Sequence, residues 1–328
     1  MGNTIGKRGI IGFLAAMLAV MAFAIALMPV SQAHAQANVS NPRIADGIVT
    51  WDVVTFGNYA QSDSTGETKE PIKWRVLKVE DGKALLVSDK NLDCKKYNDI
   101  HTSVTWETCT LRTWLNGDFL NAAFTSQEQK DILITTVQNP DNPKYEISGG
   151  NATQDKVFLL SIQESQDGAY GFLTRQARQA ANTAYATAQG VYDDNGNGFW
   201  WLRSPGDRRS YAAHVGAGGD VRVYGGNVIY SYVAVRPALW VDLGSPDLAD
   251  AGTVSFELGT ADVTFDVQGH GISPYMQYVN IGKKVQKPQD PVAEGYEFGG
   301  WYKDAECKTA WDFGNDTVTY ATTLYAKW

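Results

Sequence analysis

An apolar run near the N-terminus constrains most strongly what this chain can become. Lys7 and Arg8 give a basic start, the apolar run covers residues 9–30, and Ala33-His34-Ala35 has the A-x-A form of a cleavage site. This order is typical of a secretory signal peptide and predicts the removal of residues 1–35. An uncleaved membrane anchor is the alternative, because the run is long enough to span a bilayer of about 30 Å. No second apolar segment follows, so the sequence predicts no transmembrane domain beyond the signal segment.

Export predicts an extracellular protein that is either secreted or associated with the cell surface. The formal net charge is −8, and no cluster of Lys and Arg follows the signal segment. Nucleic acid is therefore not an expected partner, because binding to phosphates needs a basic surface. The chain after the signal exceeds an average domain of about 150 residues, which predicts two domains.

Three cysteines, Cys94, Cys109 and Cys307, follow the signal segment. In an oxidising exterior, Cys94 and Cys109 could close a disulfide loop of about 15 residues, worth roughly 3 kcal/mol. Three free thiols are the alternative. No C-x-x-C pair is present and the four histidines are scattered, so the spacing predicts no zinc site.

Alternation of apolar and polar residues predicts a β-meander at the start of the larger domain. The predicted strands cover residues 48–59, 72–79 and 84–88. A turn with glycine in place, at 80–83, joins the last two as a hairpin. Apolar residues at helical spacing predict two helices between residues 110 and 133. Two pairs, Thr125 with Glu128 and Ser161 with Glu164, have the spacing of a capping box at a helix start.

The rest of the chain divides by composition. Asn, Pro, Asp and Gly crowd residues 138–155, which predicts an exposed loop, whereas the Ala- and Gln-rich residues 172–188 predict a helix. Gly-rich turns divide residues 199–243 into short strands. The predicted fold class is α+β. The predicted boundaries are a leader at 36–47, the larger domain at 48–243, a linker or a linker plus one strand at 244–260, and a second β-patterned domain at 261–328.

Residues 207–232 combine tyrosine, arginine and glycine in a composition typical of binding loops. In a strand, Arg222 and Tyr224 would share one face, so their polar groups would project together. An ordinary solvated hairpin is the alternative. The candidate ligand-binding residues are Arg208, Tyr211, His214, Arg222, Tyr224, Asn227, Tyr230 and Tyr232.

Two further arginines, Arg203 and Arg236, are embedded in apolar sequence. A guanidinium in such surroundings needs several acceptors, because it stays charged. We therefore expect each to be partly buried and held by a carboxylate or by backbone carbonyls, not to act in catalysis.

Residues Asp193 to Gly198 reproduce the first half of a calcium loop. Asp193, Asn195 and Asn197 offer oxygen ligands at alternate positions, and glycine stands sixth. The twelfth position is Ser204, so the bidentate glutamate of such loops is missing. A tight turn held by Asp and Asn side chains is the favoured interpretation, and calcium is the one candidate cofactor.

The sequence lacks the motifs of common hydrolases. It contains no G-x-S-x-G and no H-E-x-x-H, and its histidines do not cluster. Paired carboxylates such as Glu80 with Asp81 are adjacent and would point apart in a strand, so they are poor acid–base pairs. The sequence therefore predicts that this protein is not an enzyme.

Three motifs in the C-terminal segment carry a family resemblance. They are Val263-Thr264-Phe265-Asp266, Gly295-Tyr296-Glu297-Phe298-Gly299-Gly300-Trp301-Tyr302 and Leu324-Tyr325-Ala326-Lys327-Trp328. The segment resembles the Listeria–Bacteroides repeat, the B-repeat of internalin-type surface proteins. This resemblance implies a small β-grasp-like module with a spacer or adhesion role. The residues expected to supply its core are Tyr296, Phe298, Trp301, Leu324, Tyr325 and Trp328.

Four motifs mark the larger domain. They are Val54-Thr55-Phe56-Gly57-Asn58-Tyr59, Trp106-Glu107-Thr108-Cys109-Thr110-Leu111-Arg112, Trp200-Trp201-Leu202-Arg203-Ser204-Pro205-Gly206 and Val235-Arg236-Pro237-Ala238-Leu239. Through them the domain resembles a family of exported bacterial domains of unknown function. The last two motifs are also similar to the C-type-lectin-like fold of formylglycine-generating-enzyme relatives and of hypervariable receptor-binding proteins. This similarity implies that residues 207–232 lie on a ligand-binding face. The chain lacks the late cysteine pair of those enzymes, so their activity is not carried over.

Together these features predict an extracellular binding or adhesion protein. The expected ligand is a glycan or a cell-surface protein, recognised through residues 207–232, with the repeat as a spacer. A cell-wall-associated enzyme acting on glycan or peptide is one alternative, and a purely structural envelope protein is another.

Overall fold

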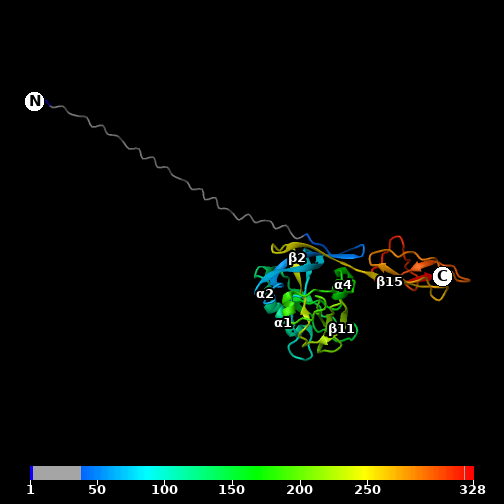
Figure 1. Cartoon of the computed structure of the whole chain (residues 1–328), viewed down its shortest axis with the longest axis horizontal. Coiled ribbons are helices and arrows are strands. Elements are labelled where there is room, and N and C mark those ends of the chain that lie inside the picture. The colour runs from blue at the N-terminus through cyan, green and yellow to red at the C-terminus, as the bar shows by residue number, and fades with distance from the viewer. Residues whose placement is uncertain (3–37, 321) are drawn as a thin grey trace. The chain divides into compact units, whose positions relative to one another are not determined.

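The computed structural model describes residues 1–2, 38–320 and 322–328. The predicted signal peptide, residues 1–35, falls almost wholly outside this part of the chain, so its cleavage stays a prediction. Among the described residues, no helix combines the length and the hydrophobicity that a bilayer crossing needs. Strands account for 37% and helices for 12% of the structure, so the fold is a mixed, β-rich one (Figure 1).

A seven-stranded sheet opens the larger domain with the predicted meander. The strands β2 (Ile48–Ala60), β3 (Lys69–Glu80) and β4 (Lys83–Ser88) pair antiparallel in sequence order. Asp81 and Gly82 form the turn between β3 and β4 with φ of 48° and 75°, a left-handed geometry that suits these two residues. The other strands of this sheet are β1 (Arg43–Ala45), β8 (Val157–Phe158), β13 (Ala238–Asp242) and β14 (Ala249–Glu257).

The segment 244–260 is more than a linker, because β14 belongs to this first sheet. It pairs antiparallel with β2 from Ala249 opposite Thr55 to Glu257 opposite Ile48. Phe256 packs edge-on against the buried Trp51, with ring centroids 5.9 Å apart. The interpretation of a linker plus one strand is the correct one. Burial of one face against Trp51 fixes the strand, although most of β14 is exposed.

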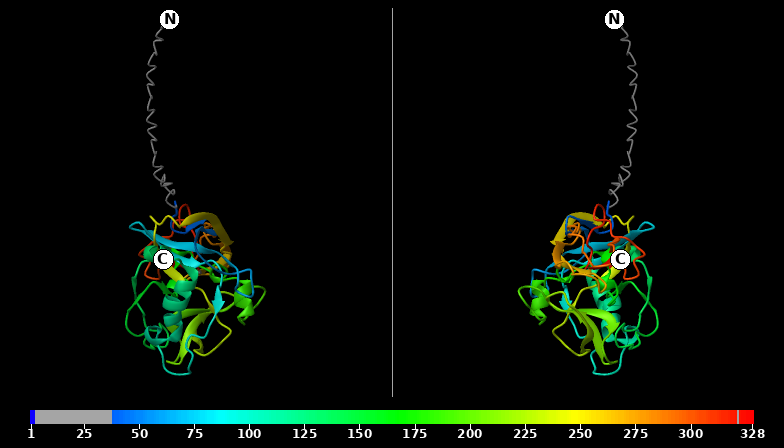
Figure 2. Two further views of the ribbon diagram at one scale, coloured as in Figure 1. Left: turned by 90° about the vertical axis from the view of Figure 1, so that its left-hand side faces the viewer. Right: turned by 90° about the vertical axis from the view of Figure 1, so that its right-hand side faces the viewer.

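A second sheet carries the Gly-rich region predicted as short strands. Its order is β11-β10-β9-β12-β5. The bounds are β5 (Asp93–Cys94), β9 (Trp200–Pro205), β10 (Tyr211–Val215), β11 (Val221–Asn227) and β12 (Ala234–Val235). Trp200 and Trp201 are fully buried, so both belong to the core. Figure 2 shows the yellow-green strands of this sheet, β9 to β12, on the side of the domain away from the blue β2.

Short helices connect the two sheets. Helices α1 (Thr110–Trp114) and α2 (Leu120–Ala123) are joined by a π-helical turn at Leu115–Phe119, and α3 (Glu128–Asp131) follows. Both predicted capping boxes are confirmed. Thr125 N donates to Glu128 Oε2 at 2.7 Å and Ser161 N donates to Glu164 Oε2 at 2.8 Å, and each glutamate N–H donates back to the hydroxyl. The remaining elements are η1 (Trp106–Thr108), η3 (Glu164–Gln166), η4 (Gly168–Tyr170), β6 (Thr135–Val137) and β7 (Thr153–Asp155).

The single helix predicted at 172–188 is wrong. Two short helices occur there, α4 (Arg175–Arg178) and α5 (Ala184–Ala188). Thr174 accepts a hydrogen bond from Ala177 N, and Thr183 accepts one from Ala186 N at 3.0 Å. Each threonine therefore caps a separate helix start, and the residues between the two helices include the buried Ala180 and the exposed Ala181.

The two arginines in apolar sequence are buried as predicted. Arg203 donates to Gln138 O at 2.9 Å, to Leu159 O at 2.7 Å and to the Glu164 carboxylate. Arg236 is fully buried, donates to Ser88 O at 2.9 Å and lies over the Trp200 ring at 4.9 Å. Both guanidinium groups serve the fold.

The predicted disulfide between Cys94 and Cys109 is absent, and both are buried free thiols. Cys94 Sγ donates to Ser231 O at 3.2 Å, whereas Cys109 Sγ donates to Trp106 O at 3.4 Å. Burial raises the pKa of each thiol to about 12, which keeps both protonated and unreactive. The predicted disulfide does not form because each thiol donates to a different backbone carbonyl, Ser231 O for Cys94 and Trp106 O for Cys109.

The C-terminal repeat forms a four-stranded sheet in the order β16-β15-β18-β17. Its strands are β15 (Thr260–Asp266), β16 (Gln277–Asn280), β17 (Gly300–Tyr302) and β18 (Thr322–Lys327). The central pair, β15 and β18, is parallel, and no helix occurs in the described residues between β16 and β17. Trp301 and Leu324 are buried as expected. Tyr296, in contrast, is 55% exposed and packs on His270, with ring centroids 4.1 Å apart.

Replacing Arg203 with lysine should lower the free energy of unfolding by about 3 kcal/mol. A single ammonium group cannot reach Gln138, Leu159 and Glu164 together, so buried acceptors lose their donor. Urea unfolding followed by tryptophan fluorescence measures the change. Arg208→Lys is the matched control, because Arg208 is exposed and pairs with its neighbour Asp207, and it should leave the unfolding midpoint unchanged. Equal shifts in the two variants would contradict the role given to Arg203.

Candidate ligand-binding surface

The hairpin of β10 and β11 positions most of the predicted binding residues. Its register places His214 opposite Arg222, and the pairing of β10 with β9 places His214 opposite Trp201. Side chains of directly opposed residues project from the same face of a sheet. Trp201, His214 and Arg222 therefore form a row across one face of the second sheet.

Four aromatic rings gather over this face, and we call them the aromatic patch: Tyr192, Phe199, Tyr230 and Tyr232. Tyr192 and Phe199 are stacked with centroids 4.4 Å apart, and Tyr230 and Tyr232 are stacked at 4.9 Å. Phe199 and Tyr232 meet edge-on at 6.5 Å, which joins the two stacks. Tyr192 is 45% and Tyr232 is 38% exposed, while the other two rings are half-buried. The patch thus offers rigid ring faces to solvent.

Arg222 places a positive charge at the edge of the aromatic patch. Its guanidinium lies over the Phe199 ring at 4.7 Å and its Nε donates to Asp220 at 2.9 Å. Burial acts against the charge, but the hydrogen bond that Arg222 donates to Asp220 and the negative charge of that carboxylate raise the pKa of Arg222. Tyr224 lies beside the guanidinium and is 47% exposed. Arg222 and Tyr224 thus provide hydrogen-bonding groups next to the ring faces.

His214 is a support of the patch and not a contact residue, which corrects its predicted role. Only 4% of its surface is exposed, and its ring lies between Phe199 at 5.6 Å and Trp201 at 5.8 Å. Burial, together with the charge of Arg222, lowers the pKa of His214 to about 4. Among the described residues, its buried Nδ1 has no hydrogen-bond partner. The imidazole is therefore neutral at pH 7.

The other predicted residues have separate places. Asn227 shapes the turn after β11 by accepting a hydrogen bond from Ile229 N at 3.2 Å. Arg208 pairs with Asp207 and lies over Tyr211 at 4.6 Å, which makes a cation–π pair of its own. Of the eight predicted residues, those that the structure brings together at the patch are Arg222, Tyr224, Tyr230 and Tyr232, with His214 beneath them.

Sequence reasoning missed Tyr192 and Phe199, which flank the turn at Asp193 to Gly198. Asp194 and Asn197 exchange backbone hydrogen bonds, and Asp193 accepts from Gly196 N at 3.0 Å. This turn returns the chain on itself and so stacks the two rings that border it. Aromatic residues on both sides of an Asp- and Asn-rich turn were the signal that could have identified them.

The same turn is the weak calcium candidate, with Asp193, Asn195 and Asn197 as its expected ligands. Asp193 Oδ1 accepts from Gly196 N and Oδ2 accepts from the Asn182 amide, both at 3.0 Å. In the part of the chain that the structure describes, no three His, Cys, Asp or Glu residues are grouped as metal ligands. The carboxylate of Asp193 therefore has a structural role, and calcium binding stays a prediction.

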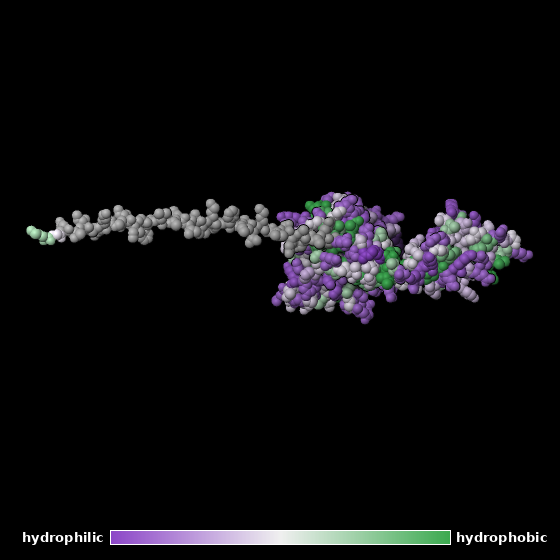
Figure 3. Space-filling view, turned by 90° about the horizontal axis from the view of Figure 1, so that it is seen from above, coloured by the Kyte–Doolittle hydropathy of each residue, from purple (hydrophilic) through white to green (hydrophobic). Residues whose placement is uncertain are grey.

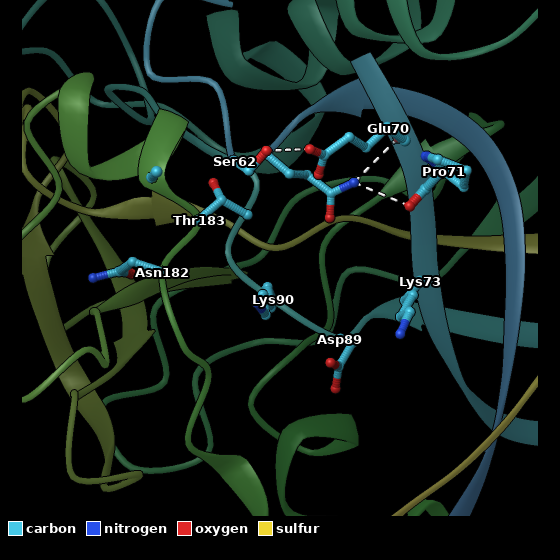
Figure 4. Close-up of a pocket in the computed structure, with 10 residues that line it drawn as sticks. Ser62, Glu70, Pro71, Lys73, Asp89, Lys90, Asn182 and Thr183 are labelled. Atoms are coloured by element: carbon cyan, nitrogen blue, oxygen red, sulfur yellow. Dashed lines mark hydrogen bonds between the residues drawn. The ribbon is translucent and has the colours of Figure 1, made fainter. Parts of the chain in front are cut away.

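A hollow of about 440 Å³, which we call the polar groove, opens between β3, the residues after β4 and the start of α5 (Figure 4). Most of its lining residues are polar. Its lining residues are Gln61, Ser62, Glu70, Pro71, Lys73, Asp89, Lys90, Asn182, Thr183 and Ala184. Asn182 connects the groove to the aromatic patch, because its amide also donates to Tyr192 O at 3.3 Å.

The face of the protein drawn in Figure 3 gives little support for a broad hydrophobic interface. On the face drawn in Figure 3, hydrophobic side chains gather in small areas separated by hydrophilic ones. Large apolar interfaces between proteins need a contiguous patch. The aromatic patch, which combines ring faces with an arginine, is the more specific surface of the larger domain.

Two families of known domains match this chain. Residues 81–243 match the family described as Domain of unknown function (DUF6273), and residues 262–327 match the Listeria-Bacteroides repeat domain. These matches confirm the repeat and the resemblance of the larger domain to a domain of unknown function. Neither family description names the C-type-lectin-like fold or formylglycine-generating enzymes, so this similarity stays a prediction.

Two curated proteins of Evansella cellulosilytica are similar to parts of the chain. The protein named "Putative Gly-rich membrane protein" is 38% identical over 76 residues, which cover 23% of this chain and 8% of the relative. The protein named "Putative membrane protein" is 48% identical over 44 residues, which cover 13% of this chain and 7% of the relative. The chain therefore spans less than a tenth of the length of these relatives.

The matched range, residues 81–243, is smaller than the folded domain. It leaves out β1, β2, β3 and β14, which belong to the first sheet. Trp51 on β2 and Trp74 on β3 are fully buried, so these strands complete the core. The physical domain therefore extends beyond both ends of the matched range.

A chain cut to residues 81–243 should fail to fold, because it removes four strands and uncovers the core that Trp51 and Trp74 fill. A chain of residues 38–258 keeps every strand of the two sheets and should unfold cooperatively on heating. Near-ultraviolet circular dichroism and thermal unfolding compare the two. Cooperative unfolding of the shorter chain would show that β1, β2, β3 and β14 are not needed.

The stability of the domain should fall as pH drops from 6.5 towards 4. His214 has an ordinary pKa of 6.5 and a folded pKa of about 4, so the unfolded chain takes up the proton first. The neutral imidazole therefore stabilises the fold above pH 6.5, and up to roughly 3 kcal/mol is lost by pH 4. Urea unfolding across this range measures the loss. His214→Phe should lack this part of the pH dependence, and identical profiles would contradict the assignment.

Proposed function

We propose that this protein is a cell-surface binding protein whose larger domain recognises a glycan through the aromatic patch. The observation that carries the proposal is the pair of ring stacks, Tyr192 on Phe199 and Tyr230 on Tyr232, beside Arg222. The repeat acts as a spacer or adhesion module. The ligand surface is a corrected form of the predicted one, since it adds Tyr192 and Phe199 and places His214 beneath it.

The chemistry of the patch supports a carbohydrate ligand. The C–H faces of sugar rings pack against aromatic faces, and fixed rings bind at a low cost in conformational entropy. Arg222 and Tyr224 offer donors to hydroxyl or carboxylate groups at the edge of such a ring. Because the four rings already form two stacks that meet edge-on, the surface is organised before a ligand arrives.

The comparisons support the location of the protein. Listeria–Bacteroides repeats are typical of surface proteins, and both relatives from Evansella cellulosilytica are described as membrane proteins. The predicted signal peptide is in agreement with export. The surface location is therefore part of this proposal, as is the role of the repeat.

The polar groove supports binding over catalysis. It contains two carboxylates, Glu70 and Asp89, which a glycan-cleaving enzyme could use as a pair. Asp89 is held by Arg75 Nε at 2.7 Å, and Glu70 accepts a hydrogen bond from the Ser62 hydroxyl. Both acids are thus held in hydrogen-bonded arrangements that suit a structural role, so we propose that the protein is not an enzyme.

Replacing Tyr230 and Tyr232 together with alanine should weaken glycan binding about tenfold or more, because buried and stacked aromatic groups dominate such contacts. Glycan-array binding of the chain from residue 36 onward identifies the ligand, and titration calorimetry gives the affinity. The same titrations with added calcium and with a chelator test whether the turn at Asp193 binds calcium. A parallel assay for release of reducing ends tests for hydrolysis.

Tyr320→Ala is the matched control, because Tyr320 is 68% exposed on the repeat and lies outside the patch. It should leave glycan affinity unchanged. If the protein binds a cell-surface protein that carries no glycan, the glycan part of the proposal is wrong and the ligand is a protein. Saturable glycan binding that survives loss of both tyrosines, or no binding at all, would overturn the proposal.

A further inference from the structure

We propose that the polar groove is a second binding site, which takes a sugar unit carrying an oxyanion group, a carboxylate or a phosphate. The groove is separate from the aromatic patch and is lined by different side chains. Its volume, about 440 Å³, lies in the range of small-molecule sites, which is roughly 300–1,000 Å³. This site goes beyond the proposed function and does not depend on it.

The charges that line the groove select an anionic ligand. Glu70 is occupied by the Ser62 hydroxyl, and Asp89 forms an ion pair with the buried Arg75. Lys73 and Lys90 are both exposed, and neither ammonium forms an ion pair or hydrogen bond within the described residues. The charge of Asp89 is therefore balanced by Arg75, and two cations face the groove against one remaining carboxylate, Glu70, in a chain whose net charge is −8. An ammonium group binds carboxylate or phosphate oxygens as a point charge.

Neutral polar groups around the lysines suit the hydroxyls of a sugar. Gln61 Nε2 donates to the backbone carbonyls of Glu70 at 3.1 Å and Pro71 at 3.0 Å. These two bonds fix the amide and leave its carbonyl oxygen as an acceptor for a ligand hydroxyl. The hydroxyl of Thr183 accepts from Ala186 N and can still donate. Figure 4 shows Lys73 and Asp89 on one side of the hollow, with Asn182 and Thr183 across from them.

The groove continues into a second hollow of about 280 Å³, which shares Asp89 and Lys90 with it. The added wall is formed by Arg75, Gln179, Ala181, Asn197, Val254 and Phe256. Val254 and Phe256 belong to β14, so this end has apolar side chains. Two adjoining hollows fit a chain of more than one sugar unit, with the oxyanion group near Lys90.

Oligogalacturonate and a sugar phosphate, each compared with its uncharged counterpart, test the site by titration calorimetry on the chain from residue 36 onward. We expect the acidic probes to bind, the neutral probes to bind much more weakly, and the affinity to fall with salt. Lys73→Gln with Lys90→Gln should weaken acidic binding about tenfold or more. Lys73→Arg with Lys90→Arg should stay within about threefold of the original, because the charge is kept.

Lys96→Gln with Lys144→Gln is the control for net charge, since both lysines are exposed and lie outside the groove. It should leave the acidic affinity unchanged, and so should the Tyr230→Ala, Tyr232→Ala variant of the patch. Retained acidic binding in that patch variant separates this site from the glycan site. Equal affinity for acidic and neutral probes, no binding of either acidic probe, or no effect of the glutamine pair would each overturn the proposal.

Discussion

The larger domain depends on one buried guanidinium, that of Arg236, at the point where the chain passes from the second sheet to the first. Arg236 follows β12, precedes β13, donates to Ser88 O at the end of β4 and lies over Trp200 of β9. The neighbouring backbone repeats this link, since Ser88 N donates to Pro237 O and Leu92 N donates to Val235 O. An always-charged group in the core must satisfy several acceptors at once, so it fixes the two sheets against each other.

Both candidate sites depend on this contact between the two sheets. The aromatic patch lies on the face of the second sheet, where Trp201 and His214 support it from below. The polar groove begins at Asp89, directly after the strand end that Arg236 holds. Asn182 belongs to the lining of the groove and donates to Tyr192 O, so one amide contacts both sites. Because Arg236 holds the two sheets together, the aromatic patch and the polar groove keep fixed positions relative to each other on the same domain.

Local signals in the sequence predicted local structure well. The meander, the turn at Asp81-Gly82 and both capping boxes depend on residues close in sequence, and all are present. The pairing of β14 with β2 joins residues about two hundred positions apart, and alternation alone could not select the partner. Burial of His214 depends on rings from other segments, Phe199 and Trp201, so its place on a polar hairpin was misleading. Tyr192 was missed for the same reason, because stacking on Phe199 needs the intervening turn.

The two buried thiols have a consequence for how this chain matures. Cys94 and Cys109 each donate to a carbonyl, and burial keeps both protonated. The larger domain therefore completes its fold without an oxidant. Its maturation needs no thiol oxidase or isomerase, and its stability does not change with the redox potential around the cell. The fold of the larger domain is therefore the same in oxidising and in reducing surroundings.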